Sequence, residues 1–238
     1  MEKKSSIISA SILALGFVIM GFCLKAGIDN FVNKGRNVEV KGLSEREVEA
    51  NKVTWPITLK ETGNEIQSLY ATIDAKTKVV KKFLTDNGIS MSEISVNPPI
   101  VNDYKTAGAY QQDVKYRYTI TSSLTVVSKN VKKVRDLISR QGELVAQDIA
   151  IDYGNDWDNR SKITYEYTDF KKMKPEMVAE AIENAQKTAE QFAKNSNSKL
   201  DKIVAADQGS FEIVDRDEST PYIKNIRVVS HITYSLKN

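Results

Sequence analysis

Hydrophobic and polar positions recur along the chain with two different periods. Alternation with a period of two, typical of strands with one buried face, runs through residues 53–60, 114–126 and 226–236. Recurrence every three or four residues, typical of amphipathic helices, runs through residues 65–86 and 174–195. The pattern therefore predicts a chain that mixes helices and strands.

Shorter strands are predicted between these segments. Val38 and Val40 indicate a strand that ends at Gly42. Pro56 cannot donate a backbone hydrogen bond, so the strand over residues 53–60 is predicted to lie at a sheet edge or to be bulged there. The other predicted short strands are 94–96, 145–153, 163–167, 200–206 and 211–213.

Each helix has recognisable end signals. Asn64 is the predicted N-cap of the helix over residues 65–86, and Asn87-Gly88 is its stop signal. A short helix is predicted over residues 130–140. Pro175 suits the first turn of the helix over residues 174–195. The apolar stripe of that helix is rich in alanine and comprises Val178, Ala181, Ile182, Ala185, Ala189, Phe192 and Ala193.

A helix stop followed by a strand occurs three times. The stops are residues 87–88, 141–142 and 195–198, and the strands that follow contain residues 94–96, 149–151 and 203–205. The predicted fold class is therefore α+β, with antiparallel sheets and helices packed on one face, built from repeated helix–strand units after an N-terminal transmembrane helix.

The N-terminal stretch Ile7–Leu24 carries no charge over 18 residues and follows Lys3 and Lys4. As a helix it would extend about 27 Å, close to the ~30 Å hydrocarbon core of a bilayer. The length favours a retained signal anchor in the inner membrane over a cleaved signal peptide. Lipidation of Cys23 is the third alternative, which the bulky Phe22 before it disfavours.

The predicted organisation has an anchor at residues 1–24, a linker at 25–37 and an α+β domain at 38–238. That domain either is single or has two subdomains with a boundary near residues 155–160. The positive-inside rule places the lysines before the anchor in the cytoplasm and the domain in the periplasm. Cleavage of the stretch would instead give a secreted periplasmic protein.

Composition excludes several classes of function. The chain has 34 Lys and Arg against 31 Asp and Glu, and no basic run, so we predict no nucleic-acid partner. Cys23 is the only cysteine and His231 the only histidine, which argues against thiol chemistry, a histidine-rich metal site and a Ser/His/Asp triad. We assign no catalytic, cofactor-binding or metal-binding residue.

The remaining candidates each have a plain structural interpretation. His231 falls on the polar face of the last strand, where we expect it to be exposed. The acidic clusters Asp152, Asp156 and Asp158, and Asp215, Asp217 and Glu218, lack calcium-loop spacing and are interpreted as solvated turns. Trp55 and the tyrosines occupy strand positions typical of the core. The segment 102–113 is interpreted as a hairpin connection and, alternatively, as a surface for a protein partner.

Several segments within residues 36–238 together form a recognisable set: Val38–Val48 with Trp55-Pro56-Ile57, Leu84–Ile89, Tyr104–Val126, Ala179–Ala193 and Ser198–Gly209. This set resembles the SIMPL-domain family of bacterial envelope proteins. The chain departs from the family pattern at Lys41-Gly42-Leu43, where many members have a second glycine. The resemblance implies an α+β envelope protein, in some members a ring-like or channel-like oligomer linked to stress, without established catalytic residues.

We therefore expect a membrane-anchored periplasmic protein with a non-enzymatic role in assembly or binding. Its expected partners are the inner membrane, further copies of the same chain and other envelope proteins. The alternative is an envelope hydrolase or ligand-modifying enzyme that uses carboxylates such as Asp156 and Asp158.

Overall fold

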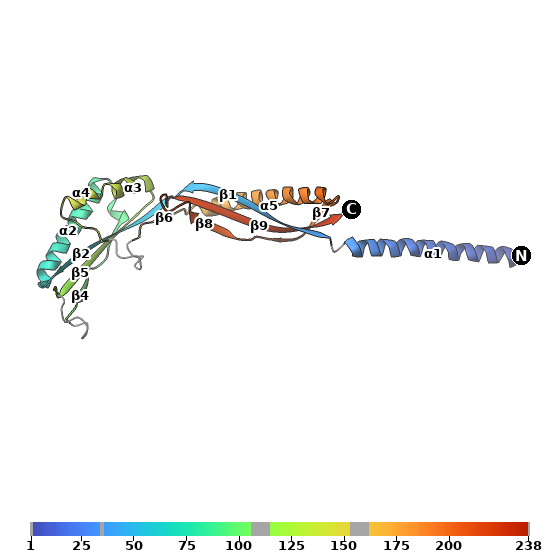
Figure 1. Ribbon diagram of the computed structural model, residues 1–238, viewed down its shortest axis with the longest axis horizontal. Coiled ribbons are helices and arrows are strands. Elements are labelled where there is room, and N and C mark those ends of the chain that lie inside the picture. Colours follow the sequence, from blue (N-terminus) through green and yellow to red (C-terminus); the bar gives the residue numbers. More distant parts are fainter. Residues whose placement is uncertain (1, 34–35, 106–114, 153–161, 238) are drawn as a thin grey trace. The chain divides into compact units, whose positions relative to one another are not determined.

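The chain divides into two compact units, and each contains one antiparallel sheet (Figure 1). The computed structural model describes residues 2–33, 36–105, 115–152 and 162–237. The subdomain boundary predicted near residues 155–160 lies outside these ranges. The first unit comprises Met1–Arg46, Lys172–Ile213 and Ile226–Asn238, and the second comprises Glu47–Lys171 and Val214–Asn225.

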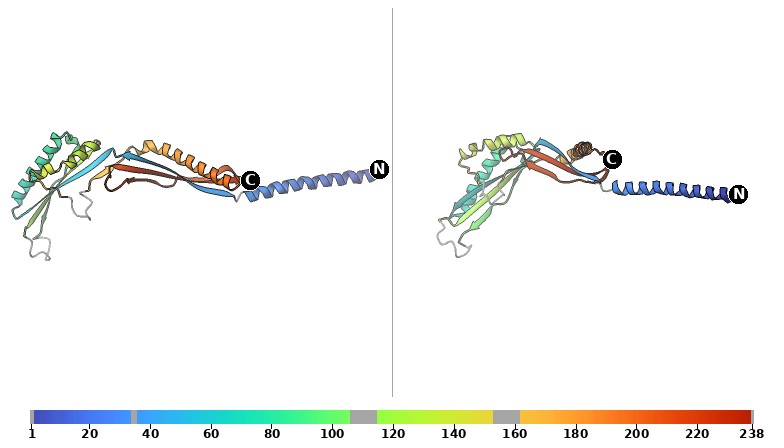
Figure 2. Two further views of the ribbon diagram at one scale, coloured as in Figure 1. Left: turned by 45° about the horizontal axis from the view of Figure 1, so that its top comes forward. Right: turned by 45° about the vertical axis from the view of Figure 1, so that its right-hand side comes forward.

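The first unit is built on a sheet of β1, β9 and β7, with β8 also paired to β9. Helix α5 lies along one face of this sheet (Figure 2). The buried cluster between them contains Val40, Ala185, Ala189, Ile232 and Tyr234. The elements assigned to this unit in whole or in part are α1 (Glu2–Asn33), β1 (Asn37–Glu49), α5 (Phe170–Asn195), β7 (Lys199–Asp207), β8 (Phe211–Asp215) and β9 (Ile223–Lys237).

The buried face of α5 is narrower than the sequence pattern predicts. Its five buried residues recur at every fourth position, so they form one stripe along the helix. Ile182 and Phe192, predicted to face inward, are exposed. The helix also begins at Phe170, so Pro175 lies inside it rather than in its first turn. The buried stripe is Met177, Ala181, Ala185, Ala189 and Ala193.

Gly42 does not end the first strand, as its sequence context predicts, but lies within the 13 residues of β1. A Cβ atom at this position would lie 1.7 Å from the backbone oxygen of Ala181. The same region of β1 bonds to α5 directly, because Asn184 donates to the Leu43 carbonyl at 2.9 Å and Ser44 donates to Glu180 at 2.8 Å. Gly42 is therefore required by the close approach of helix and strand.

The second unit is built on a sheet in the order β3-β5-β2-β6, with β4 also paired to β5. Strands β2 and β5 form an antiparallel ladder along β2 from Val53 to Gly63. Helices α2 and α3 pack against these strands (Figure 2). The elements are β2 (Lys52–Gly63), α2 (Ile66–Asp86), the 3₁₀ turn η1 (Met91–Glu93), β3 (Ile94–Val96), β4 (Ile100–Asp103), β5 (Tyr118–Ser128), α3 (Val131–Ser139), α4 (Gly142–Val145) and β6 (Thr164–Glu166).

The core of the second unit follows the alternation of β2 and β5. Val53, Trp55, Ile57 and Leu59 on β2 are fully buried. The inward face of α2 meets them with Ile73, Val80 and Leu84, and α3 contributes Val134 and Leu137. Removal of this apolar surface from water stabilises the unit. The predicted α+β class with antiparallel sheets is confirmed in both units.

Strand β2 lies between β5 and β6 rather than at the sheet edge predicted for it, and an edge is present only locally, around Pro56. Strand β6 pairs only with Lys52–Thr54 of β2, so Pro56 lies beyond its end. On that side of β2 the Thr58 carbonyl accepts a bond from the Asp152 amide at 2.7 Å. Because backbone groups two residues apart point the same way, the Pro56 nitrogen faces this side rather than β5. The missing N–H therefore costs the β2–β5 ladder nothing.

The ends of α2 follow the sequence signals only in part. The N-cap position is Glu65 without a side-chain cap, whereas Asn64 accepts a bond from the Arg117 amide at 2.9 Å. The predicted capping by Asn64 is therefore wrong, because its side-chain oxygen accepts this bond from the residue before β5 instead. The stop at Asn87-Gly88 is confirmed, since Gly88 has a φ of 81° that favours glycine.

The segment predicted as a strand over residues 145–153 has a different structure in its described part. Gly142–Val145 form helix α4, and residues 146–152 follow as turns and coil. The Ile149 amide bonds back to the Leu144 carbonyl at 3.0 Å, and both Ile149 and Ile151 pack on the core. The alternation of apolar residues in this segment therefore reflects coil whose isoleucine side chains pack on the core, not a strand. The repeated helix–strand unit is present in two of its three predicted places.

The remaining differences concern where elements begin. Strand β5 starts at Tyr118 rather than at residue 114, and β4 was not predicted. Helix α1 continues to Asn33 and so includes most of the segment predicted as a linker. In the part of the chain that the structure describes, no helix combines the length and apolar character needed to cross a membrane. The transmembrane character of α1 stays a prediction.

Candidate interaction surface

The side chain of His231 lies on the face of β9 opposite to those of Ile232 and Tyr234, as its parity predicts. It is half-buried rather than exposed. The cover comes from the connection between β7 and β8. A Cβ atom on Gly209 would lie 2.7 Å from Cδ2 of the His231 ring. The imidazole therefore packs against Gly209 in the connection between β7 and β8. This contact gives His231 a structural role.

The acidic cluster at residues 215–218 belongs to the turn that joins β8 to β9. Asp215 forms an ion pair with Lys224, which is itself buried. Asp217 accepts bonds from the Thr220 hydroxyl, from the Thr220 amide at 2.7 Å and from Arg216 at 3.0 Å. These bonds, first that of the Thr220 hydroxyl, lower the pKa of Asp217 to about 2. The carboxylate therefore holds the turn.

The substitution Asp217→Asn is expected to destabilise the second unit at pH 7, and less so in acid. A lowered pKa in the folded state contributes stability above the ordinary value of 3.8, and that stability is lost as the pH falls toward about 2. The difference in urea midpoint between wild type and variant should therefore shrink between pH 4 and pH 2. Glu218→Gln removes the neighbouring acidic side chain and is the control. Its urea midpoint should stay close to that of wild type at each pH. A pH-independent difference would contradict the role of the charge.

The other acidic cluster lies largely outside the described residues, which include Asp152 but not Asp156 or Asp158. Asp152 uses its backbone amide to extend the edge of β2. Within the described ranges, no group of three His, Cys, Asp or Glu side chains is placed to share a metal ion. The hydrolase alternative gains no geometric support from the described residues.

The segment 102–113 begins in β4, and its residues 106–113 lie outside the described ranges. Asp103 binds the Arg117 guanidinium through two nitrogens, the shorter bond being 2.8 Å. This bond, above all, lowers the pKa of Asp103. The Tyr104 amide donates to the Arg117 carbonyl at 2.9 Å. These bonds therefore hold the end of β4 beside the start of β5.

Three aromatic side chains of the second unit have structural roles, as predicted for Trp55, which is fully buried. Tyr165 and Tyr222 meet edge to face, with ring centroids 6.2 Å apart. The Arg135 guanidinium lies 3.2 Å from the Tyr222 ring centroid in a cation–π contact. These rings are therefore used within the fold.

Strand β7 is the most unusual exposed element of the first unit. It ends the sheet order, so one of its edges has no neighbouring strand among the described residues. The four consecutive apolar residues 203–206 on it are all exposed, with Ile203 at 52% and Val204 at 58%. Proteins usually protect such edges with charges, proline or a cover. Charged residues flank the run, and the register of β7 with β9 is irregular on both sides of Ile203, but the run itself contains neither a charge nor a proline.

The sequence of β7 itself indicates an unusual environment. Residues 203–206 read Ile-Val-Ala-Ala, which lacks the alternation of a strand with one polar face. Such runs are typical of strands buried on both faces. Helix α5 instead covers β1 and β9 and leaves this part of β7 exposed. The run therefore stays exposed although its composition is typical of buried strands.

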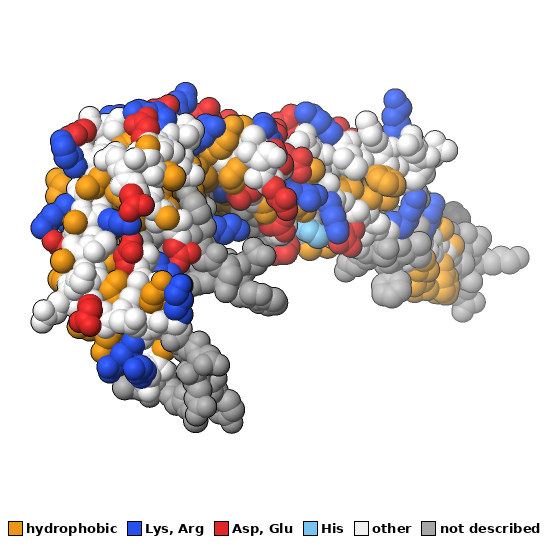
Figure 3. All heavy atoms as spheres, turned by 60° about the vertical axis from the view of Figure 1, so that its left-hand side comes forward, with side chains coloured by type: hydrophobic (Ala, Val, Ile, Leu, Met, Phe, Trp, Pro, Cys, Tyr) orange, Lys and Arg blue, Asp and Glu red, His pale blue; other side chains and the backbone are white. Residues whose placement is uncertain are grey.

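Charge is distributed evenly over the face shown in Figure 3. Basic and acidic side chains alternate there without a continuous basic stripe. Many charged side chains of the described residues form ion pairs, for example Arg46 with Glu176 at 2.9 Å and Lys76 with Glu61 at 2.7 Å. The absence of a nucleic-acid partner stays a prediction from composition.

The two units define an α+β protein with two antiparallel sheets, each with helices on one face. Residues 38–227 match the model of the SIMPL family, which is described as a protein of unknown function (DUF541). The match covers most of the chain, so the protein belongs to the SIMPL family, as the resemblance in its sequence indicated. No curated protein matches the chain.

Proposed function

We propose that the protein is a non-enzymatic assembly protein of the cell envelope that self-associates through strand β7. The observation that carries this proposal is the exposed apolar edge of β7 described above. The alanine stripe of α5, the other surface considered for self-association, is already occupied by the protein's own sheet. The edge of β7 is thus the candidate that remains available to a second copy.

The residues of β7 are self-complementary in an antiparallel arrangement. Ile203 lies opposite Tyr234 in the sheet, while Lys199 lies opposite Lys237 and Asp207 opposite His231. Along β7 both charged residues are four positions from Ile203, in opposite directions, and each side of Ile203 contains one register irregularity, so the two halves match. A two-fold axis at Ile203 would place Lys199 of each copy beside Asp207 of the other. Neither side chain forms an ion pair with a described residue.

This arrangement would join two sheets through main-chain hydrogen bonds and bury the apolar run of both copies. Light scattering of the full chain in detergent micelles tests it. We expect a dimer or a larger even-numbered oligomer whose population rises with protein concentration. A chain that stays strictly monomeric at high concentration would rule out self-association as its function.

Anchoring by α1 is the second part of the proposal. Its described apolar side chains are exposed on all sides of the helix, unlike the single stripe of α2 or α5. A helix that is apolar all round requires an apolar environment. The uncharged stretch Ile7–Leu24 provides a suitable length. The exposed residues are Leu13, Leu15, Phe17, Val18, Ile19, Met20, Phe22, Leu24 and Ile28.

Fractionation of a bacterial host that has inner and outer membranes tests the anchor. We expect the full chain to stay in inner membranes after alkaline carbonate extraction, and a chain that begins at Arg36 to be lost from them. Protease added to spheroplasts should digest the region after Arg36, which places it in the periplasm. A soluble periplasmic product that begins after Leu24 would instead establish the cleaved alternative.

A further inference from the structure

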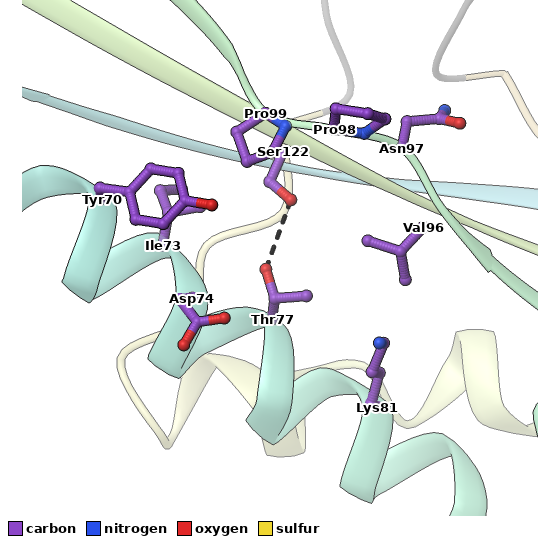
Figure 4. A pocket seen from close by; sticks show the side chains of 10 residues that line it. All are labelled: Tyr70, Ile73, Asp74, Thr77, Lys81, Val96, Asn97, Pro98, Pro99 and Ser122. Atoms are coloured by element: carbon purple, nitrogen blue, oxygen red, sulfur yellow. Dashed lines mark hydrogen bonds between the residues drawn. The ribbon is translucent and has the colours of Figure 1, made fainter.

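The second unit contains a hollow of about 320 Å³ between α2 and the edge of its sheet (Figure 4). One wall is a stripe of α2 that contains Tyr70, Ile73, Thr77 and Lys81. These residues recur at steps of three or four, so they lie on one face of the helix. Val96, Pro98 and Pro99 form the opposite wall. Volumes of about 300–1,000 Å³ are typical of small-molecule sites.

Two hydroxyl groups form the floor of this hollow. Ser122 lies on β5 between the buried residues Ile120 and Leu124, and Thr77 lies on α2 between Ile73 and Val80. The pattern predicts large apolar side chains at both positions. The two hydroxyl oxygens are 3.3 Å apart and both side chains are buried. Only one hydroxyl can donate within this pair, so the proton of the other is available to a ligand.

A bulge in the sheet edge forms the opening. The Asn97 amide bonds to the Ser123 carbonyl at 2.9 Å, and Ile100 lies opposite Thr121. Pro98 and Pro99 therefore both oppose the single residue Ser122. A bulge bends the edge strand away from its neighbour. Because neither proline has an N–H, the bulge leaves no backbone donor unsatisfied there.

Lys81 supplies a positive charge to the wall of the hollow. The other lysines of α2 are paired: Lys76 with Glu61, Lys78 with Asp74 at 2.6 Å, and Lys82 with Asp86 at 2.7 Å. Lys81 has no ion-pair partner among the described residues. In Figure 4 its side chain points toward Val96, across the hollow from the helix backbone. Its ammonium group is therefore placed to bind an anion there.

We propose that this hollow binds a small organic monocarboxylate with a compact apolar body. The Lys81 ammonium would pair with the carboxylate, and the hydroxyl proton at the floor would supply a second bond. Tyr70, Val96 and the two prolines provide apolar contact for the body of the ligand. Asp74, at the other end of the hollow, is already paired with Lys78, so among the described lining residues Lys81 supplies a single uncompensated charge, which matches one carboxylate. This inference does not depend on self-association or on the anchor.

Titration of the full chain with benzoate tests the proposal, with benzyl alcohol as a neutral probe of similar shape. The protein carries ¹³C labels on its isoleucine δ methyl groups, and the Ile73 methyl reports from the wall of the hollow. We expect a saturable shift of the Ile73 signal with benzoate. Benzyl alcohol should bind at least about tenfold more weakly because it lacks the charge.

Two variants and a matched control locate the binding. Lys81→Met keeps the length of the side chain and should weaken benzoate binding about tenfold. Ser122→Val should reduce binding further because its methyl groups fill the floor. Lys82→Met removes the neighbouring lysine, which pairs with Asp86, and should leave binding unchanged. No saturable shift at Ile73, or equal affinity of the Lys81→Met variant and wild type, would overturn the proposal.

Discussion

Replacement of Gly42 by alanine is expected to destabilise the first unit by about 3 kcal/mol or more. The new methyl group would meet the Ala181 backbone oxygen at 1.7 Å, about half of an ordinary contact distance. A backbone oxygen cannot turn aside as a side chain can, so β1 and α5 must move apart. That movement would also break the bonds from Asn184 and Ser44 that join the two elements.

Hydrogen exchange resolved by residue measures this effect in each unit separately. We expect the Ile232 amide in β9 to lose protection in Gly42→Ala, and the Ile57 amide in β2 to lose much less. Gly142→Ala is the matched control, because a Cβ atom there has no neighbour within 4 Å. In a helix this change is expected to stabilise by about 0.5–1 kcal/mol. Equal and small effects of both substitutions would show that β1 and α5 are not closely packed.

The substitution Ile203→Lys is expected to raise the dissociation constant for self-association on the order of 100-fold. In the proposed two-fold pairing, residue 203 of one copy faces residue 203 of the other, so the change places two lysines opposite each other. Like charges at such a position cost several kcal/mol. Ile182→Lys is the control, since Ile182 is an exposed isoleucine on α5 of the same unit. Concentration-dependent light scattering compares the two variants with wild type.

Charge exchange tests the register of this pairing. Lys199→Asp and Asp207→Lys should each weaken association, because each places like charges together. The double variant restores opposite charges and should recover most of the lost affinity, a coupling that a double-mutant cycle measures. Additive losses in the double variant would show that the two residues do not meet, and would exclude a two-fold axis at Ile203.

Local pattern was sufficient wherever one residue determines the backbone near it. The helix stop at Asn87-Gly88 can be predicted from the sequence because only glycine adopts a φ of 81° without strain. The local edge at Pro56 is readable because proline lacks a donor. The strand alternation of β2 and β5 is readable because each strand has one face in the core.

Pattern was insufficient where a distant segment determines the environment. Gly42 resembles a strand end in sequence, and only the position of Ala181, far along the chain, shows why glycine is needed inside β1. Ile149 and Ile151 alternate like strand residues, yet they reach the core from coil after α4. Asn64 matches an N-cap, but it bonds to the Arg117 amide. Each error arises because a tertiary contact competes with a local preference.

The sequence by itself determined the family, the α+β class and most of the helices and strands, because these depend on periodicity and on single residues with special backbones. The tertiary structure alone decided which apolar residues remain exposed. It showed that the alanine stripe of α5 is used internally, that the apolar run of β7 is left at an edge, and that Ser122 and Thr77 form a hollow beside Lys81. Exposure and proximity depend on how elements pack, and no local pattern encodes them.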